Sequence, residues 1–189
     1  MENSLLLFSL LLLLLVPSSA QMPGFVSLDC GGEEFFSDEL GLDWTPDELR
    51  YGEATSIEVL NETRKQYTSL RHFPADSRKY CYTMNVTSRT RYLLRATFLY
   101  EMRELIFLAT SPTVSVCLSN ATTGQPFIST LELRQFNGSV YFTAYEEHFY
   151  LSVSARINFG ADSEAPVRYP DDPFDRIWSS DSIKKAITL

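Results

Sequence analysis

Three carboxylates crowd into one short stretch near the C-terminal end, which reads YPDDPFDRIW from Tyr169 to Trp178. Two of Asp171, Asp172 and Asp175 could act as the acid and the base of a glycoside hydrolase, because that reaction uses a pair of carboxyl groups. Such a pair must face across a cleft with separated pKa values, whereas adjacent aspartates on a proline-punctuated turn are usually solvated. We therefore predict a packed structural corner, in which Arg176 pairs with a carboxylate, and no catalytic residue.

Metal and cofactor chemistry has weak support elsewhere in the sequence. Asp162, Glu164 and Asp171 could supply oxygen ligands for calcium, an alternative that spacing alone leaves open. His72 and His148 are the only histidines, and neither is spaced for zinc with a cysteine or with the other. The sequence also contains no glycine-rich phosphate loop and no nucleophile elbow. We expect neither a metal, nor a cofactor, nor enzyme activity in this chain.

Aromatic side chains suggest a different chemistry, namely the binding of sugars. Exposed aromatic faces stack on pyranose rings, while Asp, Asn or Arg side chains bind the hydroxyl groups. Most aromatic residues of a β-rich domain nevertheless fill its core, so each candidate has a structural reading as well. The candidates for ligand binding are Tyr67, Tyr80, Tyr82, Tyr141 and Tyr145, with Phe142 next to Tyr141.

The first twenty residues are predicted to direct export. An unbroken apolar run from Leu5 to Val16 precedes Ser18, Ser19 and Ala20, which is the pattern of a secretory signal peptide cleaved after Ala20. This run is too short to cross a bilayer, which takes about twenty apolar residues, and no later segment approaches that length. We predict a secreted or cell-surface protein, attached to a membrane only in a longer product.

Glycosylation sequences and cysteines agree with an oxidising, extracellular compartment. The sequence has four Asn-X-Ser/Thr acceptors, at Asn61, Asn85, Asn120 and Asn137. Three cysteines, Cys30, Cys81 and Cys117, allow any of three disulfide pairings and leave one thiol over. The formal net charge of −8 would repel a phosphate backbone, so nucleic acid is an unfavourable partner.

The length and composition predict one β-rich globular domain. The chain has 189 residues, of which 44% are hydrophobic and 13% aromatic. We assign residues 21–178 to the domain and residues 179–189 to a tail. Alternation of apolar and polar residues predicts strands, and their spacing is typical of an antiparallel sandwich or jelly roll. The predicted strands are Phe25 to Leu28, Ile57 to Leu60, Tyr80 to Val86, Arg91 to Tyr100, Val114 to Leu118, and Phe149 to Phe159.

Asn137-Gly138 is a strong signal for a two-residue hairpin turn. It predicts that Phe127 to Phe136 pairs antiparallel with Val140 to Tyr145. The segment Arg89 to Thr110 is harder to assign, because its apolar residues fall near helical spacing while its two halves resemble separate strands with no turn between them.

Five segments carry a resemblance to a known family. They are GFVSLDCGG (24–32), GLDWTPDELRY (41–51), LRHFPADSRKYCYTMNV (70–86), RYLLRATFLY (91–100) and YPDDPFDRIW (169–178). In this order they resemble the malectin-like ectodomain of plant leucine-rich-repeat receptor-like kinases. The resemblance implies a malectin-like β-sandwich that senses cell-wall carbohydrate or a secreted peptide, together with a co-receptor. The alternative is an interaction module that positions a receptor complex without a small ligand of its own. Kinase activity would belong only to a longer product.

The chain departs from the family pattern after Tyr100. In the family the RATFLY strand runs into a Gly-Asn turn and about two dozen further residues, whereas here Glu101 follows directly. The family also continues beyond the segment that ends at Trp178. We therefore predict an incomplete sandwich, with reduced stability and an exposed strand edge near Tyr100, because a deletion of internal strands exposes both core and edges.

Overall fold

The structure is a computed structural model, and the statements below concern the residues that it describes. These are residues 21–48, 52–59, 62–99, 101–120, 124–136, 138, 140–168 and 172–181. The predicted signal peptide and the sequons at Asn61 and Asn137 lie outside the described residues.

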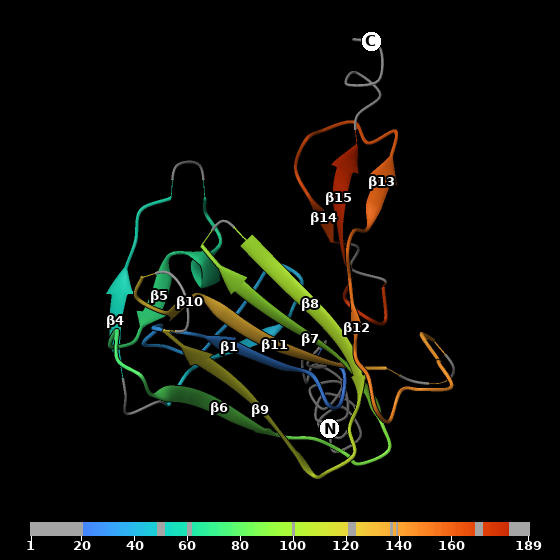
Figure 1. Cartoon of the computed structure of the whole chain (residues 1–189). Helices are drawn as coiled ribbons and strands as arrows, with labels where there is room; N and C mark the ends of the chain where they lie inside the picture. The colour runs from blue at the N-terminus through green and yellow to red at the C-terminus, as the bar shows by residue number, and fades with distance from the viewer. Residues whose placement is uncertain are drawn as a thin grey trace, which may run out of the picture.

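The largest sheet has seven strands and runs through the middle of the molecule (Figure 1). Its neighbouring strands are antiparallel except for one parallel pair, β1 with β3. In spatial order the strands are β12 (Leu151–Ser152), β8 (Glu101–Leu108), β7 (Arg91–Phe98), β11 (Thr130–Phe136), β1 (Val26–Asp29), β3 (Asp43–Pro46) and β2 (Phe36–Ser37).

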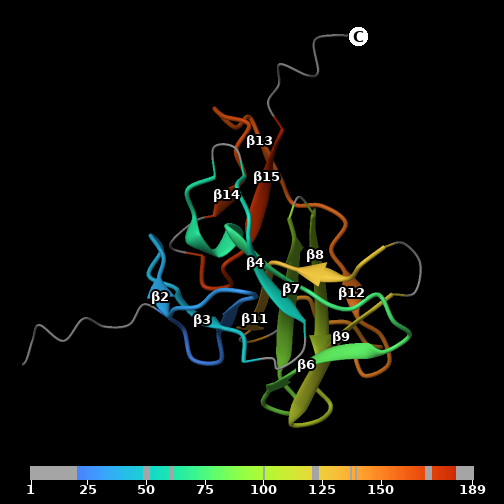
Figure 2. The same ribbon diagram turned by 90° about the vertical axis from the view of Figure 1, so that its left-hand side faces the viewer.

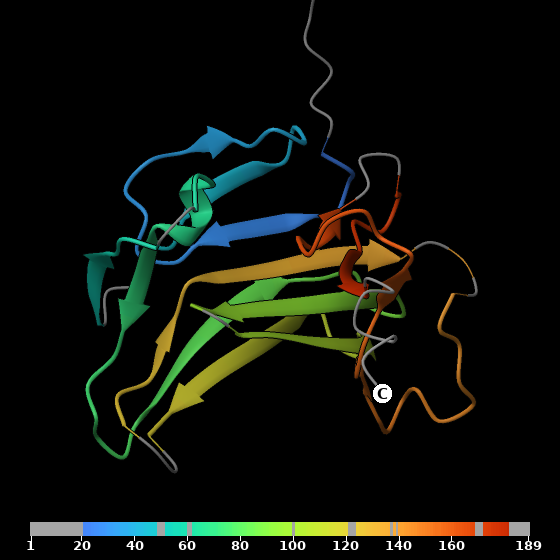
Figure 3. The same cartoon turned by 90° about the horizontal axis from the view of Figure 1, so that it is seen from above.

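Two smaller sheets complete the sandwich. The antiparallel pair of β6 (Lys79–Asn85) and β9 (Thr113–Ser119) lies below the large sheet in Figure 1. The second small sheet places β5 (Ser69–His72) between β10 (Phe127–Ile128) and β4 (Glu53–Ser56), at one end of the molecule in Figures 1 and 3. The 3-10 helix η2 (Lys65–Tyr67) precedes β5.

The C-terminal part of the chain forms a third small sheet on the opposite side of the large sheet. It consists of β13 (Ile157–Phe159), β15 (Ile177–Asp181) and β14 (Val167–Arg168), in that order. Figures 1 and 2 show it projecting from the sandwich above β7 and β8. Since β15 extends to residue 181, it passes the boundary at residue 178 that the sequence analysis gave to the domain.

The core lies between the layers and is built from side chains at every second position of the strands. On β6 every second residue is buried, which brings Tyr80, Tyr82 and Met84 against the inner face of the large sheet. Leu94 of β7 and Leu131 of β11 meet them from the other side. The central strand β7 is buried on both faces, because the C-terminal segment covers its outer face. The prediction of an all-β sandwich is confirmed.

The segment from Arg89 to Thr110 forms two strands, so the helical alternative is wrong. β7 and β8 pair antiparallel from Arg91↔Leu108 to Phe98↔Glu101, and only two residues connect them. Leu99 takes a left-handed conformation with φ 50° at this connection. A hairpin can therefore close without Gly, Asn or Asp in its loop when a long register of side-chain pairs holds both strands.

The predicted hairpin at Asn137-Gly138 is wrong. Gly138 does adopt a turn conformation with φ 80°, but residues 140–145 form no strand. The reason is that β11 already has β7 on one edge and β1 on the other, which leaves no edge free for a third strand. The segment from Phe127 to Phe136 is also divided, because β10 and β11 belong to different sheets.

Two further strand predictions are corrected. Residues 149–159 contain only the short strands β12 and β13, and Phe149 and Phe159 are 67% and 77% exposed instead of lining one buried face. Alternation is present in this segment without an opposing layer to bury it. The strand predicted at Ile57 lies earlier, as β4, and Leu60 is outside the described residues.

Among the described residues there is no helix with the length and apolar character to span a membrane.

Candidate functional site

Residues 172–178 of the YPDDPFDRIW segment lie against the outer face of the large sheet, where a network of buried charges fixes them. Arg95 of β7 stands directly opposite Glu104 of β8 and Glu132 of β11, at 2.8 Å and 3.0 Å. Asp175 enters this row from the C-terminal segment, and its Oδ2 accepts a hydrogen bond from Arg134 Nε at 2.5 Å. Arg168 of β14 contacts both Asp175 and Glu132.

The charges in this network are paired and ionised. Burial favours the neutral form of Asp175, but hydrogen bonds from Arg168 and the charges of Arg134 and Arg95 outweigh it and lower the pKa of Asp175. The pKa of Glu132 is lowered against burial in the same way. Carboxylates held by arginines in this manner are acceptors of hydrogen bonds and have no proton to transfer. The network is suited to fixing the segment in place.

Asp172 has a separate role in the same turn. Its carboxylate accepts hydrogen bonds from the backbone N–H groups of Phe174 and Arg176, and pairs with the Arg176 guanidinium at 2.8 Å. Phe174 packs edge-on against Phe136 of β11, with ring centroids 4.9 Å apart. The structure therefore shows the packed corner with an Arg176–carboxylate pair that the sequence predicted. Asp171 is outside the described residues.

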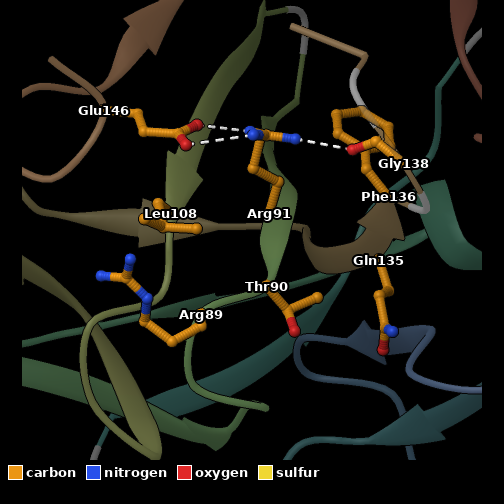
Figure 4. A pocket seen from close by; sticks show the side chains of 8 residues that line it. All are labelled: Arg89, Thr90, Arg91, Leu108, Gln135, Phe136, Gly138 and Glu146. Carbon is orange, nitrogen blue, oxygen red and sulfur yellow. Dashed lines mark hydrogen bonds and ion pairs between the residues drawn. The ribbon is translucent and has the colours of Figure 1, made fainter. Parts of the chain in front are cut away.

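A polar cleft lies at the end of the large sheet where β7 begins and β8 and β11 end (Figure 4). Its volume is about 370 Å³. Arg91 and Glu146 form an ion pair that spans one wall, with Arg91 Nη2 donating to Glu146 Oε1 at 3.0 Å. Arg91 Nη1 donates to the carbonyl oxygen of Gly138 at 2.7 Å. The cleft is lined by Arg89, Thr90, Arg91, Leu108, Gln135, Phe136, Gly138 and Glu146.

The Arg91–Glu146 pair has a fixed geometry. Both side chains are largely covered, with 13% and 15% of their surface exposed. The hydrogen bond between them lowers the pKa of Glu146 and raises that of Arg91. A neighbouring pair, Arg89 with Glu147, is much more exposed. The cleft therefore presents donors from Arg91 and acceptors from Glu146 in known positions.

Aromatic rings stand beside this cleft on residues 141–145. Phe142 and Tyr145 are each 66% exposed, and the Arg91 guanidinium lies 5.5 Å from the centroid of the Phe142 ring. Tyr141 is half-buried and packs on Phe136 at 5.3 Å between ring centroids. Of the predicted ligand-binding residues, Tyr141 therefore packs on a residue that lines the cleft, and Tyr145 is exposed next to Glu146 in the chain.

The other three predicted aromatic residues lie elsewhere. Tyr80 and Tyr82 are 8% and 3% exposed in the core, where their rings pack against Phe73, so they cannot stack on a ligand. The alternation of apolar and polar residues along β6 is the sequence signal that both tyrosines face the core. Tyr67 is half-buried on η2, with the Arg64 guanidinium 4.7 Å from its ring centroid, and burial raises its pKa.

Sequence reasoning missed Arg91 and Glu146, which define the cleft. They are 55 residues apart in the chain, and no spacing rule links them. The one local signal is that Arg91 occupies the first position of a strand, where a side chain can reach over the end of a sheet. Arg95, Glu104 and Glu132 were also missed, because charged residues on a predicted strand are normally assigned to the solvent face.

The cysteine pairing is settled by the antiparallel register of β6 and β9. Cys81 is directly opposite Cys117, and the two form the disulfide. Cys30 is a buried free thiol, and burial raises its pKa, so it has no reactive character in the folded protein. Asn85 and Asn120 are exposed, as N-glycosylation requires, and their modification stays a prediction.

No group of three or more His, Cys, Asp or Glu side chains that could hold a metal ion occurs in the part of the chain that the structure describes. The predicted calcium alternative involves Asp162 and Glu164, which lie in that part, and Asp171, which does not.

The sandwich is of a known domain class. The family model described as "Malectin-like domain" matches residues 28–103 and 101–188. The chain belongs to the malectin-like family.

Similar proteins are plant receptor kinases. The chain is 40% identical over 201 residues to a probable LRR receptor-like serine/threonine-protein kinase of Arabidopsis thaliana, At1g67720, covering 88% of this chain and 22% of the relative. A second probable kinase of the same type and organism, At1g51810, is 31% identical, with 94% and 24% covered. The chain therefore spans less than a quarter of the length of these relatives.

Solved structures of low sequence identity share the fold. The ANXUR2 extracellular domain from Arabidopsis thaliana superposes with a TM-score of 0.65 at 16% identity, over 83% of this chain and 55% of that one. The plant receptor-like kinase FER gives a TM-score of 0.61 at 14% identity, over 83% and 54%.

The family match is divided into two parts. The two parts overlap at residues 101–103. The alignment to At1g67720 has 201 positions, whereas 88% of 189 residues is about 166, so about 35 positions of the alignment have no residue of this chain. Neither value places those positions along the chain, so a segment missing after Tyr100 stays a prediction.

Proposed function

We propose that this chain is an extracellular ligand-sensing module of a receptor-like kinase, and that its polar cleft binds a neutral carbohydrate. The single observation that carries the proposal is the Arg91–Glu146 pair, fixed beside the exposed ring of Phe142. Kinase activity and attachment to the plasma membrane would belong to a longer product that includes the further parts of the relatives.

The chemistry of the cleft suits sugar hydroxyls. A hydroxyl group donates one hydrogen bond and accepts others, whereas Arg only donates and ionised Glu only accepts. A fixed Arg91–Glu146 pair can therefore satisfy both functions of a hydroxyl without reorganising. Because the two charges neutralise each other, a neutral sugar fits better than an acidic one.

The surroundings of the cleft supply the apolar part of such a site. The exposed ring of Phe142 offers a face of the kind that stacks on a pyranose, and Tyr145 follows three residues later. The volume of about 370 Å³ lies within the usual range of roughly 300–1,000 Å³ for small-ligand sites. A secreted peptide remains the competing ligand class, and the experiment below separates the two.

The test is calorimetric titration of the secreted chain with neutral cello-, xylo- and manno-oligosaccharides, and with an unrelated peptide mixture. We expect one oligosaccharide class to bind, and Phe142→Ala to weaken that binding at least about fivefold, since a lost aromatic contact costs about 1 kcal/mol. Phe159→Ala is the matched control, because Phe159 is 77% exposed on β13 and should leave binding unchanged. Binding of peptides alone, or equal losses in both variants, would refute a sugar site at the cleft.

A second candidate is the interaction module without a small ligand. The buried ion network favours it, because Asp175 and Arg168 hold the C-terminal segment rigidly on the sheet. In that case no oligosaccharide binds, while a co-receptor ectodomain binds and loses affinity when the segment is loosened by Asp175→Asn.

A further inference from the structure

One stretch of the large sheet has an open strand edge at residues 101–103. β12 pairs with β8 only at Leu105 and Ile106. Val153 N–H also donates to the carbonyl oxygen of Glu104 at 3.0 Å. Before Glu104, the residues Glu101, Met102 and Arg103 are all exposed, although β7 pairs with them on the inner side.

The backbone at this edge presents hydrogen-bonding groups to solvent. In an antiparallel strand, the outward-facing backbone groups belong to alternate residues. Glu104 faces outward toward Val153, so the next outward residue is Met102. An exposed donor and acceptor on one residue form a ready template for a second strand.

A cleft of mixed polar and apolar lining lies beside this edge, on the inner side of β8. Its volume is about 510 Å³, and its walls include the half-buried side chains of Phe98, Leu118 and Phe127 together with Glu101 and Arg103. The half-buried Val114 and Val116 of β9 continue the partly covered surface. The two parts of the family match overlap at residues 101–103, which form this edge.

The open edge is complementary to itself. If Met102 pairs antiparallel with Met102 of a second copy, Glu101 falls opposite Arg103 of the partner, and Arg103 opposite Glu101 of the partner. Opposite charges across a strand pair are stabilising, and like charges are destabilising. Glu101 and Arg103 are 59% and 70% exposed and now pair only with each other, so both are accessible to a partner strand.

We propose that this edge joins two copies of the chain in an isologous dimer, with β8 of each copy paired antiparallel about Met102. The two-fold axis passes between the two Met102 residues and makes the large sheets continuous across the interface. The hairpin connection at one side and β12 at the other limit the pairing to residues 101–103, so the dimer is transient.

Sedimentation equilibrium of the secreted chain tests the dimer. The weight-average mass should rise from monomer toward dimer between about 1 µM and about 1 mM. Glu101→Arg and Arg103→Glu each place like charges opposite one another, so each variant alone should have a dimer dissociation constant raised at least about tenfold. The measurement is repeated after enzymatic removal of N-glycans, because the sequon at Asn120 follows the cleft residue Ser119.

Two controls make the result specific. The double variant Glu101→Arg/Arg103→Glu restores self-complementarity and should dimerise like the original chain. A mixture of the two single variants should form a heterodimer, since one is acidic and the other basic at both positions. Glu101 and Arg103 are both exposed, so the fold is not at risk. A chain that stays monomeric throughout, or dimers insensitive to both single reversals, would overturn the proposal; binding of a strand peptide without self-association would also overturn it.

Discussion

Asp175 lies among arginines from three different strands: Arg95 of β7, Arg134 of β11 and Arg168 of β14. Its backbone carbonyl also accepts a hydrogen bond from Arg95 Nη2 at 2.6 Å. Removing one partner of a buried ion pair leaves uncompensated charge in a region that water does not reach. Asp175 is therefore the side chain through which the C-terminal segment depends most strongly on the sandwich.

Asp175→Asn should lower the free energy of unfolding by about 3 kcal/mol, because it removes the charge while keeping the shape. Urea denaturation measures this quantity. Glu147→Gln is the matched control: Glu147 pairs with Arg89 at an exposed position, so its loss should cost less than about 0.5 kcal/mol. Equal effects in the two variants would show that the network contributes no more than a surface pair.

The same network predicts a dependence of stability on acid pH. The pKa values of Asp175 and Glu132 are lowered in the folded protein relative to about 3.9 and 4.3 in the unfolded chain. Their contribution is therefore complete above the unfolded pKa and is lost as the pH falls toward the folded one. The original chain should lose more unfolding free energy between pH 7 and pH 3 than Asp175→Asn does; an equal loss contradicts this assignment.

At the residue scale, the sequence could predict local contacts but not distant ones. The Arg176–carboxylate pair was predictable because Asp172 and Arg176 are four residues apart on one turn. The Arg95–Asp175 contact spans 80 residues. Arg95 and Glu132 resemble solvent-facing strand residues, and only the later segment that covers them turns that face into an interior.

At the scale of elements, β6 and β9 could be predicted from alternation, and their register then determined the disulfide. Cys81 and Cys117 are paired in that register, which leaves Cys30 as a free thiol in the buried core. The three pairings that the sequence left open could not be separated earlier, because register depends on which residues face the second layer.

Alkylation of cysteine thiols tests the Cys81–Cys117 disulfide. The raised pKa and burial of Cys30 should protect the folded chain from iodoacetamide. After denaturation without reductant, we expect one modified cysteine, at Cys30, and after reduction all three. Peptide mass spectrometry identifies the sites. Labelling of Cys81 or Cys117 before reduction would contradict the disulfide.

Missing layers and occupied edges explain the strand predictions that were wrong. Alternation in residues 149–159 is genuine, but no opposing layer buries its apolar side chains, and Phe149 and Phe159 stay exposed. Likewise Asn137-Gly138 carries a turn signal, yet both edges of β11 are occupied. A local pattern predicts the tendency to form a strand, whereas a free edge and an opposing layer decide whether the strand forms.

At the scale of the whole molecule, the chain forms a malectin-like sandwich with one open side. Phe98, Leu118 and Phe127 remain half-buried there. Reduced stability stays a prediction. Inserting the corresponding segment of At1g67720 between Tyr100 and Glu101 should raise the midpoint of urea unfolding, because it would cover the open side. A glycine–serine insert of equal length is the control, and it should not raise the midpoint.

The polar cleft depends on the assembled fold, because distant parts of the chain form its walls. These are β7, β8, β11, Gly138 and Glu146. NMR titration of the labelled, secreted chain with the neutral oligosaccharides tests the central claim most directly. The account predicts saturable shifts at Arg91, Phe142 and Glu146, with none at Phe159 or on the β6–β9 pair. Shifts confined to the β13–β15 sheet, or none with any of these sugars, would contradict it.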